Sequence, residues 1–204
     1  MRGSLITFEG IDGAGKSTHL AWALEFLKER GMPVLLTREP GGTEFGENLR
    51  DLLLTGAHTL HPETEALLMF AIRCEHVERV IRPALARGEM VLCDRFTDAT
   101  YAYQGGGHGV SVEKLRILEQ WVHPDLQPTL TLYFDLALDL ARSRLAKQGS
   151  PDRFEREGVD FFSRVRKTYL KRAEEFPHRI RLIDAGRPLN LIQKELEVIL
   201  LSLC

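Results

Sequence analysis

The chain contains 204 residues, of which 44% are hydrophobic and 27% are charged, and its formal net charge is -2. This composition predicts a globular protein with a sizeable core and argues against intrinsic disorder. Because the charges nearly balance, no overall basic field favours nucleic acid, and any bound phosphate must be held by local groups. The three cysteines lie far apart, which argues against a disulfide framework and a C-x-x-C metal pair.

The opening segment MRGSLITFEG leaves no room for a cleavable signal before the first expected strand. No apolar run approaches the roughly 18 residues that a membrane-spanning helix requires. We therefore expect a cytoplasmic protein with neither a membrane partner nor a nucleic-acid partner.

Short apolar runs alternate along the chain with longer segments of helical period. Strands are expected over residues 4–8, 33–37, 90–93, 129–134 and 179–183. Helices are expected over residues 16–30, 45–54, 62–87, 111–122, 136–147, 158–175 and 189–203. This alternation predicts a single α/β domain over residues 1–204, in which helices cover both faces of a five-stranded parallel sheet in three layers. The polar stretch KQGSPDR, residues 147–153, reads as an exposed mobile loop.

A glycine-rich motif follows the first expected strand and opens the first expected helix. It consists of Gly10, Ile11, Asp12, Gly13, Ala14, Gly15, Lys16, Ser17 and Thr18. The pattern G-x-x-x-x-G-K-S in this context predicts a phosphate loop that binds ATP or a related triphosphate through backbone N–H groups. We expect Lys16 to reach the β- and γ-phosphates and the Ser17 hydroxyl to bind Mg²⁺.

An acidic and a basic residue follow the third expected strand, EMVLC. Asp94 is suited to the Mg²⁺ shell, either directly or through water, although a carboxylate at this point can also simply cap a helix or turn. The adjacent Arg95 can clamp a phosphate with two parallel hydrogen bonds.

The rest of the sequence favours a kinase over a switch. A guanine-nucleotide switch needs N-K-x-D, and Asn48 and Asn190 both lie in other contexts. The cations Arg142, Arg144, Lys147 and Arg153 lie on or beside the loop KQGSPDR. One interpretation is a lid of about residues 142–156 that closes over a transferring phosphoryl group. On spacing alone, a solvated basic helix face explains these cations equally well.

Four ordered motifs resemble thymidylate kinases of the bacterial type. They are FEGIDGAGKST, TREPGGT (37–43), DRFTDATYAYQGGG (94–107) and DRFE followed by FF (152–162). The resemblance covers nearly the whole chain and implies a fold like that of the nucleoside monophosphate kinases. It also implies phosphorylation of dTMP to dTDP by ATP with Mg²⁺, for dTTP synthesis, in a homodimer with helix 62–87 as a plausible interface.

The resemblance also implies roles for residues on the acceptor side. Arg38, Arg50 and Arg95 match positions that face the acceptor phosphate. Glu39 lies near the acceptor site, where it is expected to order a water or the metal. Asp12 matches an acidic position associated with the acceptor sugar and the metal.

Three further matches concern the nucleoside. Arg73 matches the arginine that binds the thymine edge, and Tyr103 and Gln104 match positions that wall the sugar and base. An aromatic ring against C2′ leaves no room for a ribose hydroxyl. A buried amide near the base edge would be left unpaired if the wrong base entered, at a cost of about 1 to 3 kcal/mol.

The family places a catalytic arginine either in the phosphate loop or in the lid. Here the loop position is Gly13, so Arg144 and Arg153 become the candidates for stabilising transition-state charge. In phosphoryl transfer an arginine in this role contributes roughly 10³- to 10⁵-fold in rate.

The sequence departs from the family pattern at two positions. The family stacks a phenylalanine on thymine four residues before Arg73, where this chain has Met69, and Phe70 lies three before. One residue turns a helical side chain by about 100°, so either Met69 or Phe70 can contact the base. Ala99 replaces the usual serine, and Thr100 beside it can supply the hydroxyl.

The leading interpretation is therefore an ATP:dTMP phosphotransferase. A kinase for another deoxynucleotide or nucleoside is a second interpretation, because both departures touch base recognition. A non-catalytic ATP-binding switch is a third, and it has no use for three arginines opposite the phosphate loop.

Overall fold

One parallel sheet forms the centre of the molecule. The computed structural model describes residues 3–55, 60–146, 153–154 and 157–203. Within them the sheet has the strand order β2-β3-β1-β4-β5, and every neighbouring pair is parallel. The strands are β1 (Ser4–Glu9), β2 (Val34–Arg38), β3 (Met90–Asp94), β4 (Leu130–Asp135) and β5 (Ile180–Asp184). All five expected strands are confirmed, with ends that shift by at most one residue.

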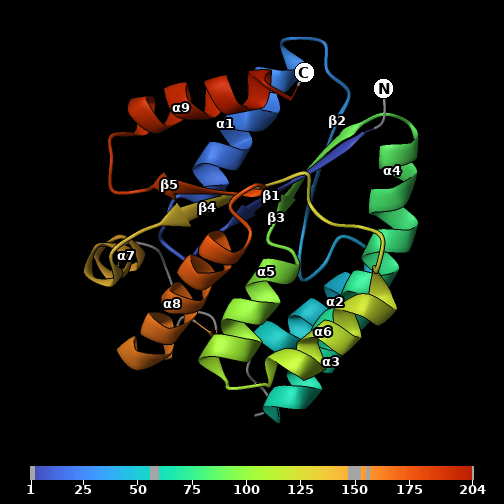
Figure 1. Cartoon of the computed structure of the whole chain (residues 1–204), viewed down its shortest axis with the longest axis vertical. Coiled ribbons are helices and arrows are strands. Elements are labelled where there is room, and N and C mark those ends of the chain that lie inside the picture. Colours follow the sequence, from blue (N-terminus) through green and yellow to red (C-terminus); the bar gives the residue numbers. More distant parts are fainter. Residues whose placement is uncertain (1–2, 56–59, 147–152, 155–156, 204) are drawn as a thin grey trace.

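Helices cover both faces of this sheet, as Figure 1 shows. The helical elements are α1 (Lys16–Lys28), α2 (Glu44–Leu54), α3 (Pro62–His76), η1 (Val77–Ile81), α4 (Arg82–Ala86), α5 (Thr97–Thr100), η2 (Tyr101–Gly107), α6 (Val112–Val122), α7 (Leu138–Leu145), α8 (Val159–Glu175) and α9 (Leu189–Leu201). Helices α1 and α9 lie on one face, and η1, α4, α5, η2 and α8 lie on the other (Figure 1). The expected three-layer α/β fold is thus confirmed.

The side chains of β1 explain why the strands read as continuous apolar runs. Ile6 and Phe8 belong to the core cluster that includes the buried side of α1. Leu5 packs instead with Val77 and Ile81 of η1 on the opposite face. Since successive strand residues point to opposite faces and both faces are covered, nearly every position of a central strand must be apolar.

The long helix expected over residues 62–87 is one helical path with an irregularity. It runs from α3 through the π-helical turn η1 into α4. Pro83 lies just after this turn and has no N–H to donate, so the wider π turn relieves the clash that a proline ring makes with the preceding turn. The path ends at Gly88, whose φ of 79° lies in the left-handed region that glycine tolerates.

A helical segment over residues 97–107, comprising α5 and η2, is the element that the sequence analysis missed. The run Gly105–Gly107 reads as a helix breaker, but here it serves close packing between helices. A Cβ added at Gly106 would lie 2.1 Å from Thr168 Oγ1, and one added at Gly107 would lie 2.3 Å from the Phe161 ring of α8. The glycines therefore let α8 approach η2.

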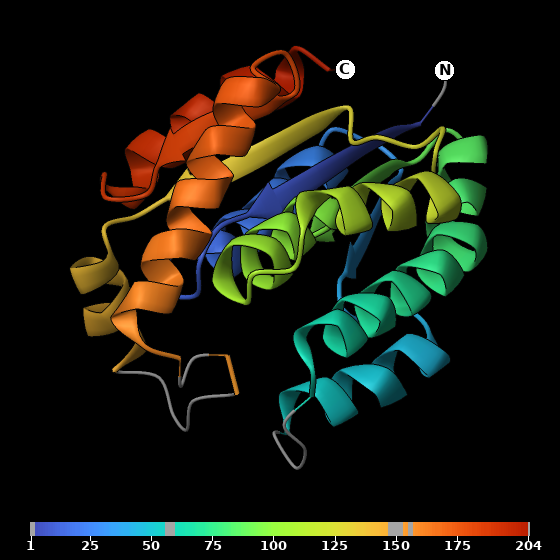
Figure 2. The same cartoon turned by 60° about the horizontal axis from the view of Figure 1, so that its bottom comes forward.

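The carboxyl end of the sheet is flanked by helices on two sides. Figure 2 shows α2 and α3 on one side and α7 and α8 on the other. Residues 147–152, which are most of the expected loop, and residues 155–156 lie outside the described residues, so the lid stays a prediction. None of the helices described here is long and apolar enough to cross a membrane.

Candidate active site

The phosphate loop connects β1 to α1, as the motif predicts. Gly13 and Gly15 adopt φ values of 80° and 86°, which side chains with a Cβ rarely tolerate. Lys16 is buried at the start of α1, and its Nζ donates to the carbonyl of Ile11 at 3.2 Å. Burial and the nearby Arg95 lower the pKa of Lys16, so an anion beside it would favour its charged form.

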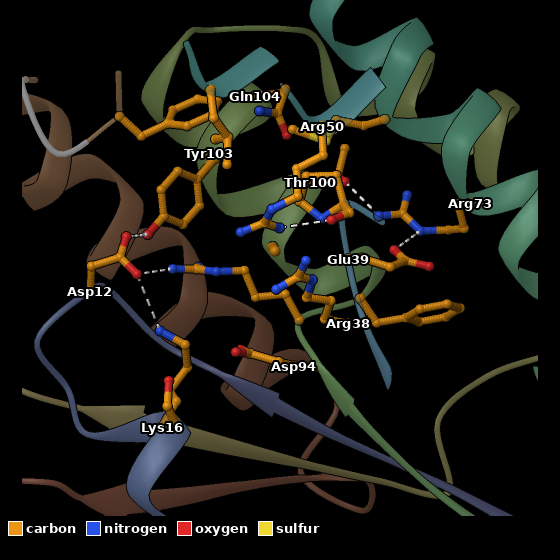
Figure 3. Close-up of a pocket in the computed structure, with 18 residues that line it drawn as sticks. Asp12, Lys16, Arg38, Glu39, Arg50, Arg73, Asp94, Thr100, Tyr103 and Gln104 are labelled. Atoms are coloured by element: carbon orange, nitrogen blue, oxygen red, sulfur yellow. Dashed lines mark hydrogen bonds and ion pairs between the residues drawn. The ribbon is translucent and has the colours of Figure 1, made fainter. Parts of the chain in front are cut away.

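Two cavities meet at this loop. The first, of about 370 Å³, is lined by these predicted site residues: Asp12, Lys16, Ser17, Arg38, Glu39, Arg50, Met69, Arg73, Asp94, Arg95, Thr100, Tyr103 and Gln104 (Figure 3). The second, of about 620 Å³, is lined by Asp12, Gly13, Ala14, Gly15, Lys16, Ser17, Thr18 and Arg144 together with residues of the 185–192 segment. Asp12, Lys16 and Ser17 line both cavities. Gly10 and Ile11 line neither and only support the loop.

Arg95 has an unusual backbone conformation at the centre of the first cavity. Its φ of 67° lies in the left-handed region, which for a residue with a Cβ marks strain held by its surroundings. One guanidinium nitrogen donates to Asp12 Oδ1 at 2.7 Å, while Nη1 is buried with no hydrogen-bond partner among the described residues. Burial raises the pKa of Asp12, but Arg95 and Lys16 outweigh it and hold that pKa at about 2.

Glu9, which the sequence analysis did not single out, is the last residue of β1 and contacts the backbone directly after Arg95. Its carboxylate accepts from the backbone N–H of Phe96 and from the hydroxyl of Tyr169, both at 2.7 Å. Burial and the nearby Asp98 raise the pKa of Glu9 to about 8. The bond to Phe96 fixes the backbone directly after Arg95 and so helps to maintain the strained conformation.

Arg73 is held by hydrogen bonds on two of its three nitrogens. Its Nε donates to Glu39 Oε2 at 2.8 Å, and Nη2 donates to Thr100 Oγ1 at 2.9 Å (Figure 3). Nη1 is buried and has no partner in the described part of the chain. The other Glu39 oxygen lies 2.9 Å from His76 Nδ1. Each oxygen of Glu39 thus contacts one protein group, and its expected role in ordering water or the metal stays a prediction.

The structure distinguishes Met69 from Phe70. Met69 lines the first cavity, whereas Phe70 does not. The Phe70 ring packs instead against the Arg73 guanidinium, 4.7 Å from ring centroid to Cζ, and Phe96 contacts the same group at 5.3 Å. Phe70 therefore supports Arg73 by a cation–π contact and does not line the first cavity.

Arg38 and Arg50 line the first cavity together with Arg73. Arg38 donates to Glu47 Oε2 at 2.7 Å and is half-exposed. Arg50 donates to the carbonyl of Pro40 at 2.7 Å, and burial together with the neighbouring Arg38 lowers its pKa. Four guanidinium groups that line one cavity favour a strongly anionic ligand.

Asp94 and Ser17 provide the oxygen atoms suited to a divalent cation. Both line the first cavity, and Asp94 Oδ1 is buried without a hydrogen-bond partner among the described residues. In that same part of the chain, no group of three or more His, Cys, Asp or Glu residues could hold a metal by itself. This pattern suits Mg²⁺, which usually takes one or two protein ligands together with substrate phosphates and water.

The predicted lid cations lie in different places. Arg144 of α7 donates to the carbonyl of Gly13 at 3.3 Å and to that of Ala185 at 3.1 Å, whereas Arg142 is exposed. A Cβ at Gly13 would lie 2.7 Å from the carbonyl oxygen of Ala141, so α7 occupies the space that a loop arginine would need. Arg153 pairs with Glu65 of α3 and lines neither cavity, and Lys147 lies outside the described residues.

Glu65 and His76 are buried polar residues that the sequence analysis also missed. Glu65 accepts from Gln104 Nε2 at 2.8 Å, and His76 Nε2 lies 2.7 Å from Thr37 Oγ1. The sequence pattern could have identified them, because both residues share helical spacing with Met69 and Arg73 in PETEALLMFAIRCEH. Residues that differ by three or four positions lie on one helix face.

Comparison with known proteins identifies the family of the chain. The thymidylate kinase family model matches residues 8–196. The thymidylate kinase of Nitrosospira multiformis is 58% identical over 197 residues, which cover 97% of this chain and 96% of that protein. That of Cupriavidus metallidurans is 58% identical over 203 residues and 100% of both chains. A crystal structure of thymidylate kinase from Ehrlichia chaffeensis aligns with a TM-score of 0.80 at 33% identity, covering 98% of this chain and 99% of that one. The chain therefore belongs to the thymidylate kinase family.

Proposed function

We propose that this protein transfers the γ-phosphoryl group of ATP to the phosphate of dTMP, which yields dTDP and ADP and supplies dTTP synthesis. One observation carries the proposal. The phosphate-loop cavity and the arginine-lined cavity meet at Asp12, Lys16 and Ser17. A donor in one cavity and a nucleoside monophosphate in the other bring their phosphates together at Lys16.

In the transfer, a phosphate oxygen of dTMP attacks the γ-phosphorus, and the bond between that phosphorus and the β,γ-bridging oxygen of ATP breaks. Such transfers depend mainly on positioning and charge stabilisation. Lys16 lines both cavities, Arg95 lines the first, and Arg144 lies on the donor side. We assign these three cations to the charge that develops on the transferring group, and Arg153 joins them on closure of the lid.

On the acceptor side, we assign Arg38, Arg50 and Arg95 to the phosphate of dTMP. Arg73 and Gln104 are assigned to the base edge, and Met69 to its face. Three features support this division: the first cavity contains all these residues, Nη1 of Arg95 and of Arg73 lack partners among the described residues, and Phe70 lies outside the cavity.

Tyr103 and Asp12 are assigned to the sugar of dTMP. The Tyr103 hydroxyl lies 3.5 Å from Asp12 Oδ2, and its ring packs against the Arg95 guanidinium. Thr100 is assigned to base recognition through its bond to Arg73. These contacts hold the ring of Tyr103 in place, as the exclusion of a ribose 2′-hydroxyl requires.

We further propose that Mg²⁺ accompanies ATP, held by Ser17 and by Asp94 directly or through water. The buried, unpartnered Asp94 oxygen and the hydroxyl of Ser17 form an oxygen donor set that fits this ion. When bound, Mg²⁺ neutralises phosphate charge and orients the donor oxygens.

A homodimer through α3 and α6 is also proposed. Leu67 on α3 is 54% exposed, and Ile117 and Trp121 on the neighbouring α6 are 65% and 80% exposed. Exposed apolar side chains on adjacent helices are typical of an interaction surface. Light scattering should report a dimer that Trp121→Lys converts to a monomer, and a wild-type monomer at micromolar concentration would contradict the proposal.

We place the protein in the cytoplasm, since Cys74 is a free and exposed thiol of the kind that a reducing compartment preserves.

The proposed activity is tested by resolving the products of an incubation with ATP, Mg²⁺ and dTMP by ion-exchange chromatography. We expect equal amounts of dTDP and ADP, and Lys16→Met should abolish both. Formation of ADP and inorganic phosphate without dTDP would show a nucleotide hydrolase or switch instead of a kinase.

A further inference from the structure

Glu65 is a buried carboxylate at the edge of the base pocket. It is 1% exposed, and its Oε1 accepts from Gln104 Nε2 at 2.8 Å. Its Oε2 pairs with Arg153, and His108 Nε2 lies 3.5 Å from Oε1. A carboxylate that pairs with a guanidinium accepts hydrogen bonds, so the end of the Gln104 amide that faces it must be the donating end.

This contact fixes the orientation of the Gln104 amide. An amide has a donating end and an accepting end that differ little in shape, and a rotation of the terminal group exchanges them. Rotation of Gln104 would place its amide oxygen against the Glu65 carboxylate, where two acceptors repel each other. The amide nitrogen of Gln104 therefore faces Glu65. No described residue donates to the amide oxygen, and the Gln104 side chain lines the first cavity (Figure 3).

Arg73 presents the opposite polarity in the same cavity. Glu39 and Thr100 hold two of its nitrogens, and the buried Nη1 has no partner among the described residues. The pocket thus offers a fixed donor from Arg73 and a fixed acceptor from Gln104. Thymine and uracil carry the complementary pair, a ring N3–H beside the O4 carbonyl. Cytosine carries the reverse pair, an unprotonated N3 beside an amino group.

We propose that Glu65 is a specificity-determining positioning residue, which excludes cytosine by locking Gln104 with its oxygen toward the base. This inference rests on the proposed function, because it assigns a base to the first cavity. Glu65 acts only through Gln104, and the selection concerns the imide edge that thymine and uracil share.

The test replaces Glu65 by glutamine, which can either accept or donate and so permits both orientations of Gln104. Values of kcat/KM are measured for dTMP, dUMP and dCMP. In Glu65→Gln the dTMP:dCMP ratio should fall about tenfold or more, since one correctly paired hydrogen bond ceases to discriminate. The dTMP:dUMP ratio should stay unchanged, whereas general loosening of the pocket would alter both ratios.

Glu63→Gln is the matched control, because Glu63 lies two residues earlier on α3, is exposed and pairs with Lys114. It should leave both ratios unchanged. If Glu65→Gln does not fold, Glu65→Asp keeps the charge beside Arg153 but shortens the reach to Gln104, and it should lower the dTMP:dCMP ratio by a smaller factor. An unchanged dTMP:dCMP ratio in the folded variant would overturn the inference, whereas a wild type inactive on dTMP would overturn the proposed function itself.

Discussion

The buried pair of Arg73 and Glu39 provides a sharp test of how the wall of the first cavity is held. Both side chains are almost fully buried, at 2% and 3% exposure, and their contact is 2.8 Å. Burial raises the pKa of Glu39, but Arg73 and His76 outweigh it and the net shift is downward, so the carboxylate is ionised at neutral pH. Glu39→Gln keeps the shape of the side chain, removes its charge and replaces one acceptor oxygen by a donating amide nitrogen.

The expected loss of stability follows from the geometry. Removing one partner of a buried ion pair costs about 3 to 5 kcal/mol, because the other charge is left buried and uncompensated. Glutamine can still accept one hydrogen bond from Arg73, and this bond offsets about 1 kcal/mol of the lost stability. We therefore expect Glu39→Gln to lower the free energy of unfolding by about 2 to 4 kcal/mol, equivalent to a fall in Tm of roughly 5 to 15 °C for a chain of this size.

Urea denaturation of wild type, Glu39→Gln, Arg73→Met and the double variant measures this coupling. The double variant should be more stable than the sum of the single losses predicts, since it no longer contains an unpaired charge. Asp125→Asn, which breaks the exposed pair with Arg82, is the control and should leave stability nearly unchanged. A loss below about 1 kcal/mol in Glu39→Gln, or additive losses in the double variant, would refute the reasoning.

Three other predictions concern the lid arginines and the carboxylate beneath the site. Arg144→Ala should lower kcat on the order of 10³-fold. The control is Arg142→Ala on the same helix, which should leave kcat unchanged because the Arg142 side chain is exposed. Equal effects of the two substitutions would mean that α7 contributes no specific cation. Arg153→Ala should lower kcat far more than it weakens dTMP binding, and unchanged turnover would remove Arg153 from the catalytic set. The pKa of Glu9 is about 8 in the folded protein and about 4.5 in the unfolded chain. Between these two pH values the unfolded chain loses this proton and the folded protein keeps it. The free energy of unfolding of the wild type should therefore fall, relative to that of Glu9→Gln, as pH rises from about 4.5 to 8. A difference in unfolding free energy between these two proteins that does not change with pH would contradict the raised pKa.

The sequence predicted the sheet and the phosphate loop well because both depend on local patterns. Apolar runs bounded by turns locate the strands, and the glycine motif specifies a backbone conformation within a few residues. Residues 97–107 were missed because three successive glycines usually end a helix. Here the same glycines are required by contact with α8, a partner more than fifty residues further along the chain. Local propensity cannot report such tertiary packing.

The candidate site was predictable as a set of residues but not as a set of contacts. Arg73 was expected at the base, yet its hydrogen bonds to Glu39, in the loop after β2, and to Thr100 of α5 join segments that meet only in three dimensions. The choice between Met69 and Phe70 depended on the rotation of α3 about its axis, which spacing alone left open. Glu65 could have been found, because it lies one helical turn before Met69 on the same face.

The central claim is that the two cavities serve transfer to a thymidine monophosphate, and a coupled assay of ADP formation tests it most directly. ATP and Mg²⁺ are offered with dTMP, dUMP, dCMP, dGMP or thymidine in separate reactions. We predict ADP formation that depends on the acceptor and is fastest with dTMP. ADP release without an acceptor, or a higher kcat/KM for any of the other acceptors than for dTMP, would contradict the account.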